Sequence, residues 1–67
     1  MKIPDLDIYR SANLLVQQHG EDAPIEAAMR ADAMLEAGDL DGYVVFKRVL
    51  RAVGELQGAK VLDEKLH

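Results

Sequence analysis

The sequence contains no cysteine, and other residue types that commonly carry chemistry are scarce. Without cysteine there is neither a disulfide framework nor a thiolate metal site, a pattern that fits a reducing cytoplasm. Ser11 is the single serine, threonine is absent, and no histidine nearby stands in the order of a catalytic triad. The glycines are isolated and form no phosphate-binding loop. We therefore expect a protein that is not an enzyme and that binds no cofactor.

Long apolar runs are also missing. No uninterrupted apolar segment approaches the roughly 20 residues that a membrane-spanning helix needs. Asp5 and Asp7 come before any apolar run, which does not fit a signal peptide. The sequence thus predicts a cytoplasmic protein that does not contact a membrane.

One short stretch resembles a metal site but lacks two of the ligands that the site needs. Residues 39–44 look like the middle of an EF-hand loop, with acids two apart followed by Gly42. In that alignment Ala37 stands at the first ligand position and Arg48 at the position of the bidentate glutamate, so calcium binding is disfavoured. His19 has no second histidine or cysteine at a zinc-binding spacing. We expect no metal site.

Three amphipathic helical patterns follow one another, at about residues 5–19, 23–37 and 40–57. Gly20 and Gly38 are stop signals for the first two helices, and Asp22 and Asp39 are candidate N-caps for the second and third. The sequence predicts an all-α fold, a compact three-helix bundle in one domain of residues 1–58. Residues 59–67 are expected to form a frayed C-terminal tail.

The three apolar stripes differ in the size of their side chains. The second helix buries mostly alanine, so its backbone should approach the bulkier side chains of the third closely, and Gly42 could aid this approach. The predicted core positions are Ile8, Tyr9, Ala12, Leu15, Val16 and His19 in the first helix, Ala27, Ala28, Ala31, Met34 and Leu35 in the second, and Tyr43, Phe46, Val49, Leu50, Val53 and Leu56 in the third.

Charge is distributed unevenly over the 67 residues, whose net charge is −4. Residues 42–54 hold three bases and no acid, whereas residues 21–41 are strongly acidic, with Arg30 against Glu21, Asp22, Glu26, Asp32, Glu36, Asp39 and Asp41. The simplest interpretation is a pair of antiparallel helices whose exposed rims attract each other.

Two surface features stand out beyond this interpretation, although both also fit an ordinary solvated surface. Ile25 and Met29 form an apolar spot edged by acids, and Val44 lies within a basic strip of Lys47, Arg48 and Arg51. A chain this short has a small core, so self-association or a protein partner would add stability. We expect a non-catalytic protein-protein interaction module or small homo-oligomer that uses these six residues. The alternative is a small regulator that binds nucleic acid or another polyanion through the basic strip, which the net negative charge disfavours.

Short motifs along the chain resemble those of a known family. The run from His19 to Ala23 resembles an HG-x-DA loop, and the run from Gly38 to Gly42 resembles a GD-x-x-G turn. Both are similar to motifs of a family of short, uncharacterised bacterial all-helical proteins, and the resemblance spans about residues 8–57. It implies a compact helical domain and no particular activity. The hairpin around Gly38 is also similar in architecture to one unit of a tetratricopeptide-like repeat.

Overall fold

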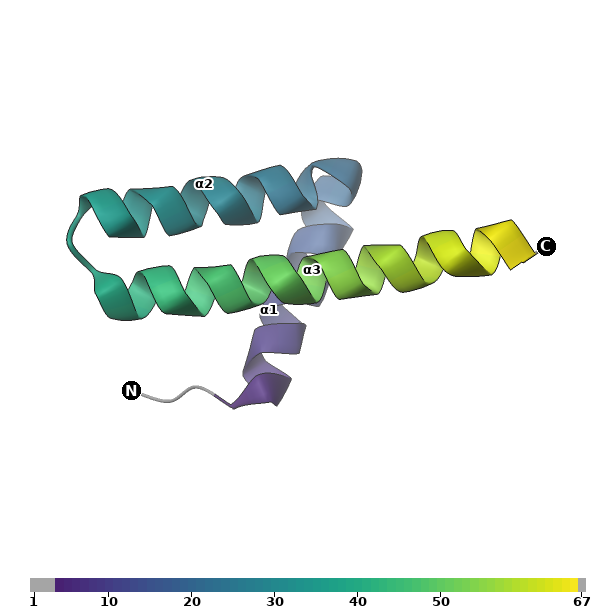
Figure 1. Ribbon diagram of the computed structural model, residues 1–67, viewed down its shortest axis with the longest axis horizontal. Helices are drawn as coiled ribbons and strands as arrows, with labels where there is room; N and C mark the ends of the chain where they lie inside the picture. The colour runs from purple at the N-terminus through teal and green to yellow at the C-terminus, as the bar shows by residue number, and fades with distance from the viewer. Residues whose placement is uncertain (1–3, 67) are drawn as a thin grey trace.

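The computed structural model describes the backbone of residues 4–66 and the side chains of residues 4–58. This part of the chain is helical and contains no strand, which confirms the all-α prediction. Helix α1 spans Asp5–His19, a short 3₁₀ helix spans Gly20–Asp22, α2 spans Ala23–Glu36, and α3 spans Leu40–Leu66 (Figure 1).

The turn between α2 and α3 is closed by backbone and side-chain hydrogen bonds. Gly38 has φ of 78°, a left-handed conformation that glycine adopts without a steric penalty. The Gly38 amide donates to the Leu35 carbonyl at 3.1 Å and the Asp39 amide to the Met34 carbonyl at 2.9 Å, the pair of bonds that ends a helix in a Schellman motif. The Asp39 carboxylate then accepts a hydrogen bond from the Gly42 amide at 2.8 Å and so caps α3. Both signals expected at this turn are confirmed.

The connection between α1 and α2 differs in part from the prediction. Gly20 ends α1 with φ of 57°, as expected, and its amide bonds to the Val16 carbonyl. Asp22 stands at the N-cap position of α2, as predicted, but it lies in the 3₁₀ helix and its side chain makes no capping hydrogen bond. The backbone enters α2 directly from the 3₁₀ turn, with Pro24 in the first turn of α2.

The core consists largely of small side chains. Val49 and Val53 are the largest fully buried residues, and the buried set is Ile8, Ala12, Leu15, Ala23, Ala27, Ala31, Val49, Ala52 and Val53. Val16, Val45, Phe46 and Leu50 pack against this cluster and are partly buried. The close approach expected at Gly42 is confirmed, because a Cβ added there would lie 2.9 Å from the Met34 sulfur.

Three predicted core positions lie at the edge of the packed region instead. Tyr9, Leu35 and Leu56 are exposed, so their assignment to the core is wrong. Helical periodicity assigned them to the apolar stripes, but each stripe extends further around its helix than the neighbouring helices reach. These three side chains therefore remain accessible to water or to another molecule.

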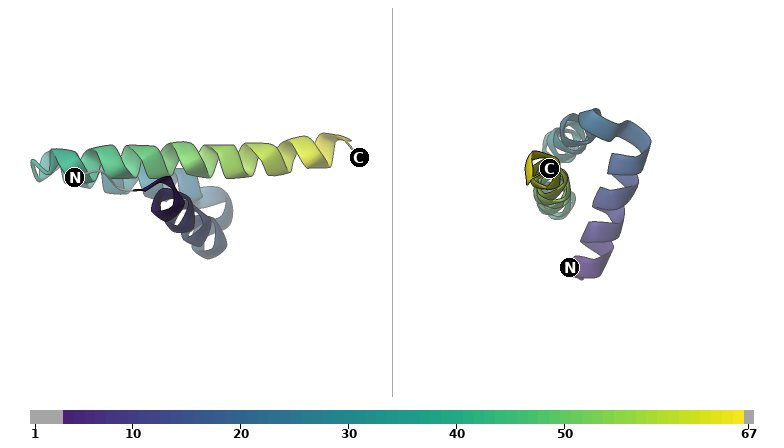
Figure 2. Two further views of the ribbon diagram at one scale, coloured as in Figure 1. Left: turned by 90° about the horizontal axis from the view of Figure 1, so that it is seen from below. Right: turned by 90° about the vertical axis from the view of Figure 1, so that its right-hand side faces the viewer.

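The arrangement of the helices is a hairpin crossed by a third helix. Helices α2 and α3 run side by side in opposite directions, and α1 crosses them on one side (Figures 1 and 2). Because α1 does not run alongside the other two, one side of the hairpin is covered by α1 and the opposite side is not.

The third helix is longer than predicted. Its backbone remains helical to Leu66 and extends past the start of α2 (Figure 1), so the predicted end near Gln57 is wrong. Gly58, which follows the predicted end directly, does not stop the helix, since it is not among the glycines with positive φ. Glycine costs a helix about 1 kcal/mol without ending it, and residues 59–66 are mostly good helix formers. The side chains of the predicted tail, residues 59–67, lie outside the described residues.

Candidate interaction surface

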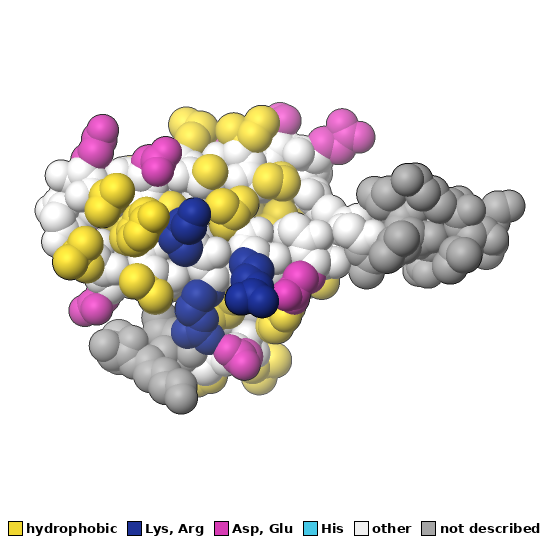
Figure 3. All heavy atoms as spheres, in the orientation of Figure 1, with side chains coloured by type: hydrophobic (Ala, Val, Ile, Leu, Met, Phe, Trp, Pro, Cys, Tyr) yellow, Lys and Arg dark blue, Asp and Glu magenta, His cyan; other side chains and the backbone are white. Residues whose placement is uncertain are grey.

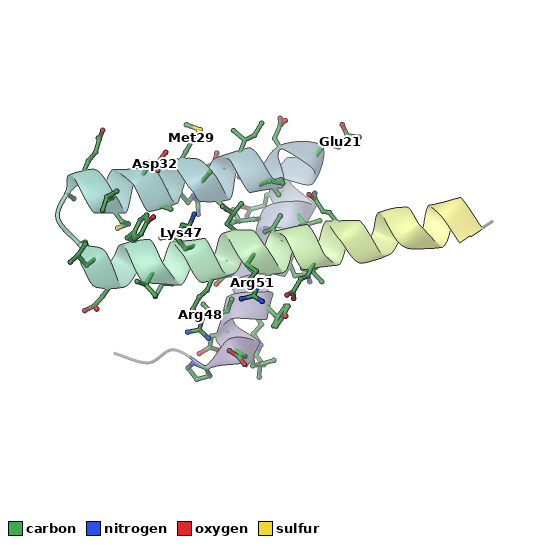
Figure 4. The ribbon with its side chains drawn as sticks, viewed as in Figure 1. Glu21, Met29, Asp32, Lys47, Arg48 and Arg51 are labelled. Carbon is green, nitrogen blue, oxygen red and sulfur yellow. The ribbon has the colours of Figure 1, made fainter. Side chains whose placement is uncertain are left out.

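The three bases of the predicted basic strip have different surroundings. Arg48 Nη2 forms an ion pair with Asp5 Oδ1 of α1 at 2.5 Å, and Arg51 Nε lies 3.8 Å from Glu55 Oε1 one turn along α3. Among the described residues Lys47 forms no ion pair. Figure 4 shows Lys47 beside α2, whereas Arg48 lies on the side of α3 nearer α1. The strip is therefore divided between the α1 junction and the surface of the hairpin.

A tyrosine strengthens the junction between α1 and α3. The Tyr9 hydroxyl donates a hydrogen bond to Glu55 Oε2. This bond, and secondly the negative charge of Glu55, raises the pKa of Tyr9 above its ordinary value of 10.0. At the other end of α1, Gln57 Nε2 donates to the Gly20 carbonyl at 2.8 Å. These polar contacts fasten α1 across α3.

A cavity of about 230 Å³ lies at the same junction, lined by Asp5, Ile8, Tyr9, Arg48, Arg51, Ala52 and Glu55. Ligand pockets usually measure roughly 300–1,000 Å³. The charged groups that line the cavity are also paired with one another, since Arg48 contacts Asp5 and both Tyr9 and Arg51 contact Glu55. The charged groups of the lining therefore serve to hold α1 against α3, and they need no ligand to account for them.

The opposite charges of the two hairpin helices do not form ion pairs across the hairpin. Arg30 pairs within α2 with Glu26 at 3.2 Å, and the described pairs of α3 involve α1 or α3 itself. No ion pair joins α2 to α3 within residues 4–58. The acidic surface of α2 and Lys47 of α3 are consequently available to another molecule.

The predicted apolar contacts do not form one surface. Met29 is 61% exposed and lies at the outer edge of α2, away from α3 (Figure 4). Ile25 is exposed one helical turn earlier on the same side of α2. Val44 is 54% exposed on α3, and its helical spacing places it beside Lys47. The six predicted contact residues thus fall at the α2 edge, on the hairpin and at the α1 junction.

A larger surface covers the side of the hairpin that α1 leaves open. Apolar side chains gather over α2 and α3 in this view, around one of the Lys or Arg side chains (Figure 3), and Lys47 occupies that place in Figure 4. Leu40, Val44 and Lys47 share one exposed face of α3, and Asp32 and Leu35 are neighbours at the end of α2. We call these five residues the hairpin face.

The sequence-based selection missed Leu35 and Leu40. Leu35 fitted the apolar stripe of the second helix, and Leu40 stood next to the turn. They are 48% and 64% exposed, respectively. The spacing of Leu40, Val44 and Lys47 at i, i+4 and i+7 was a signal that could have extended the predicted surface to Leu40.

The described residues show neither a metal-binding cluster nor a membrane-spanning helix. Within this part of the chain, no cluster of three or more histidine, aspartate or glutamate side chains is arranged to hold a metal ion. None of the helices described is long and apolar enough to cross a membrane.

Comparison with known proteins returns no match, whether with protein families, with curated proteins or with solved structures. The family resemblance expected from the HG-x-DA loop and the GD-x-x-G turn stays a prediction.

Proposed function

We propose that this chain is a non-catalytic protein-protein interaction module, with its three helices as the functional unit and the hairpin face as its contact surface. One observation carries the proposal: among the side chains that the structure describes, more of the large apolar ones are exposed than are fully buried. The buried residues larger than alanine are Ile8, Leu15, Val49 and Val53, whereas Leu6, Tyr9, Leu14, Ile25, Met29, Leu35, Leu40, Val44 and Leu56 are exposed.

This distribution favours a partner for an energetic reason. Burying a leucine or valine side chain contributes roughly 1.5–3 kcal/mol, and a short chain has a small core to stabilise it. Apolar side chains gathered on one face gain that energy only when another molecule covers them. At the hairpin face, three such side chains adjoin an acid and a base, Asp32 and Lys47, that form no ion pair within the described chain.

The alternative function, binding of nucleic acid or another polyanion, has less support. It requires Lys47, Arg48 and Arg51 to act together on phosphates. Arg48 and Arg51 instead contact Asp5 and Glu55, so a polyanion would have to displace carboxylates from them. Binding of that kind would weaken steeply with added salt, whereas contacts through Leu35, Leu40 and Val44 would not.

Site-specific photo-crosslinking in the producing cells tests the proposed surface. A photoreactive amino acid at Val44 should give a discrete crosslinked protein product, because this position would lie inside the contact. The matched control is Leu14 of α1, which is 52% exposed and lies outside the hairpin face. Equal crosslinking at both positions, or none at Val44, would contradict the proposal.

A further inference from the structure

The hairpin face has an identifiable occupant. We propose that it binds the same face of a second copy of this chain. The two-fold axis lies in the interface, over the hairpin face, and runs parallel to α2 and α3 midway between them. In this dimer, α2 of each chain lies over α3 of the other. The inference rests on the proposed function and names the partner of that surface.

Charge complementarity selects this pairing. Helix α2 and its flanking turns are acidic, whereas residues 42–54 of α3 contain bases and no acid. An axis along the hairpin places acidic α2 opposite basic α3 twice, once for each chain. An axis across the hairpin would instead place α3 against α3, bringing two copies of Lys47 and Arg51 to the same interface. Like charges at a desolvated interface repel each other and oppose association, so the first arrangement is favoured.

The positions of the apolar residues fit the same arrangement. Rotation about an axis along the hairpin leaves the position of a residue along that axis unchanged. Leu35 lies next to the turn and so do Leu40 and Val44 at the start of α3, so Leu35 of each chain meets the partner's Leu40 and Val44. Further from the turn, Asp32 of each chain lies near the partner's Lys47; Figure 4 shows these two side chains at neighbouring places along the hairpin.

The interface is isologous, because the same patch is used by both chains. Each apolar cluster and each Asp32–Lys47 pair therefore occurs twice, and a single substitution changes the interface at two places. The assembly is also closed, because each chain uses its hairpin face in this one contact and has no second copy of that face to offer. A dimer is the expected end product, without growth into filaments.

Light scattering on the full chain measures the dimer directly. The wild type should have twice the mass of the chain, and Val44→Asp should raise the dissociation constant more than about 100-fold, because a carboxylate would enter an apolar contact twice. Met29→Asp is the matched control, since Met29 is more exposed than Val44 but lies at the outer edge of α2. It should remain a dimer. Circular dichroism verifies that both variants stay helical.

A charge-exchange experiment tests the geometry. Asp32→Lys and Lys47→Asp should each be monomers when alone, because the interface then contains like charges. An equal mixture of the two variants should form a heterodimer, in which position 32 of each chain is again opposite in charge to position 47 of the other. Recovery in the mixture requires contact between chains and cannot arise from a contact within one chain.

The outcomes separate this inference from the proposed function. A monomeric wild type, or dissociation by Met29→Asp in place of Val44→Asp, overturns the dimer. If the wild type is monomeric and Val44 still crosslinks to a different protein in cells, the interaction function stands and only the second copy is wrong. If the wild type is a dimer and the mixed variants do not associate, the proposed pairing of α2 with α3 is overturned.

Discussion

At the scale of single residues, glycine has different roles at different positions of this chain. Gly38 occupies a left-handed conformation that closes the α2–α3 turn, while Gly54 lies inside α3 with open space around the position of a Cβ. A side chain at Gly38 would therefore be strained, and one at Gly54 would be accommodated.

These positions give opposite predictions for the same substitution. Gly38→Ala should lower the free energy of unfolding by about 1 kcal/mol, because alanine is disfavoured at positive φ. Gly54→Ala should raise it by roughly 0.5–1 kcal/mol, because alanine is the better helix former. Urea denaturation followed by circular dichroism measures both. An equal effect of the two variants would contradict the assignment of Gly38 as the helix stop.

At the scale of the elements, the alanines of α2 determine how closely α3 and α1 approach. Ala27 is fully buried in the core cluster, whereas Ala33 of the same helix is exposed. Ala27→Leu should destabilise the fold by about 1–3 kcal/mol, since added methylenes would push the helices apart. Ala33→Leu is the control and should change stability by less than about 0.5 kcal/mol. Chemical denaturation would refute close packing if both variants were equally stable.

The docking of α1 on α3 should depend on pH through Tyr9. Because Glu55 raises the pKa of Tyr9, the folded chain holds this proton more tightly than the unfolded chain. The resulting stabilisation is present below about pH 10 and is lost as the pH rises through the raised pKa.

An absorbance titration of the phenols checks this prediction. The chain has two tyrosines, and Tyr9→Phe should remove the one with the raised pKa. Glu55→Gln should move that titration back toward the ordinary value, because the accepting negative charge is gone. A wild-type curve unchanged by Glu55→Gln would show that the hydrogen bond between Tyr9 and Glu55 does not form in solution.

At the scale of the whole molecule, dimerisation makes stability depend on protein concentration. Unfolding of a dimer releases two chains, so each tenfold increase in concentration should stabilise the folded state by about 1.4 kcal/mol per dimer. The midpoint of thermal unfolding of the wild type and of Met29→Asp should therefore rise with concentration. That of Val44→Asp should stay constant. A constant midpoint for the wild type would contradict a dimer coupled to folding.

The relation between sequence and structure changes with scale. Helix positions, the stop at Gly38 and the cap at Asp39 were predictable, since they depend on the dihedral preferences and hydrogen bonds of residues close together in the chain. The predicted end of the third helix near Gln57 was wrong for a related reason. A glycine is a strong stop only where it takes a positive φ, and the pattern at Gly58 does not determine its conformation.

Of the surface, the sequence by itself determined which side chains were apolar or charged and how they follow helical spacing, because those properties belong to each helix alone. Only the tertiary structure decided which of them stay exposed. The crossing of α1 engages Arg48 with Asp5 and covers one side of the hairpin (Figure 2), whereas Leu35, Leu40 and Val44 remain exposed. The physical reason is that the exposure of a side chain depends on neighbours distant in the sequence. The periodicity of one helix does not determine from which side, or at what angle, another helix packs against it.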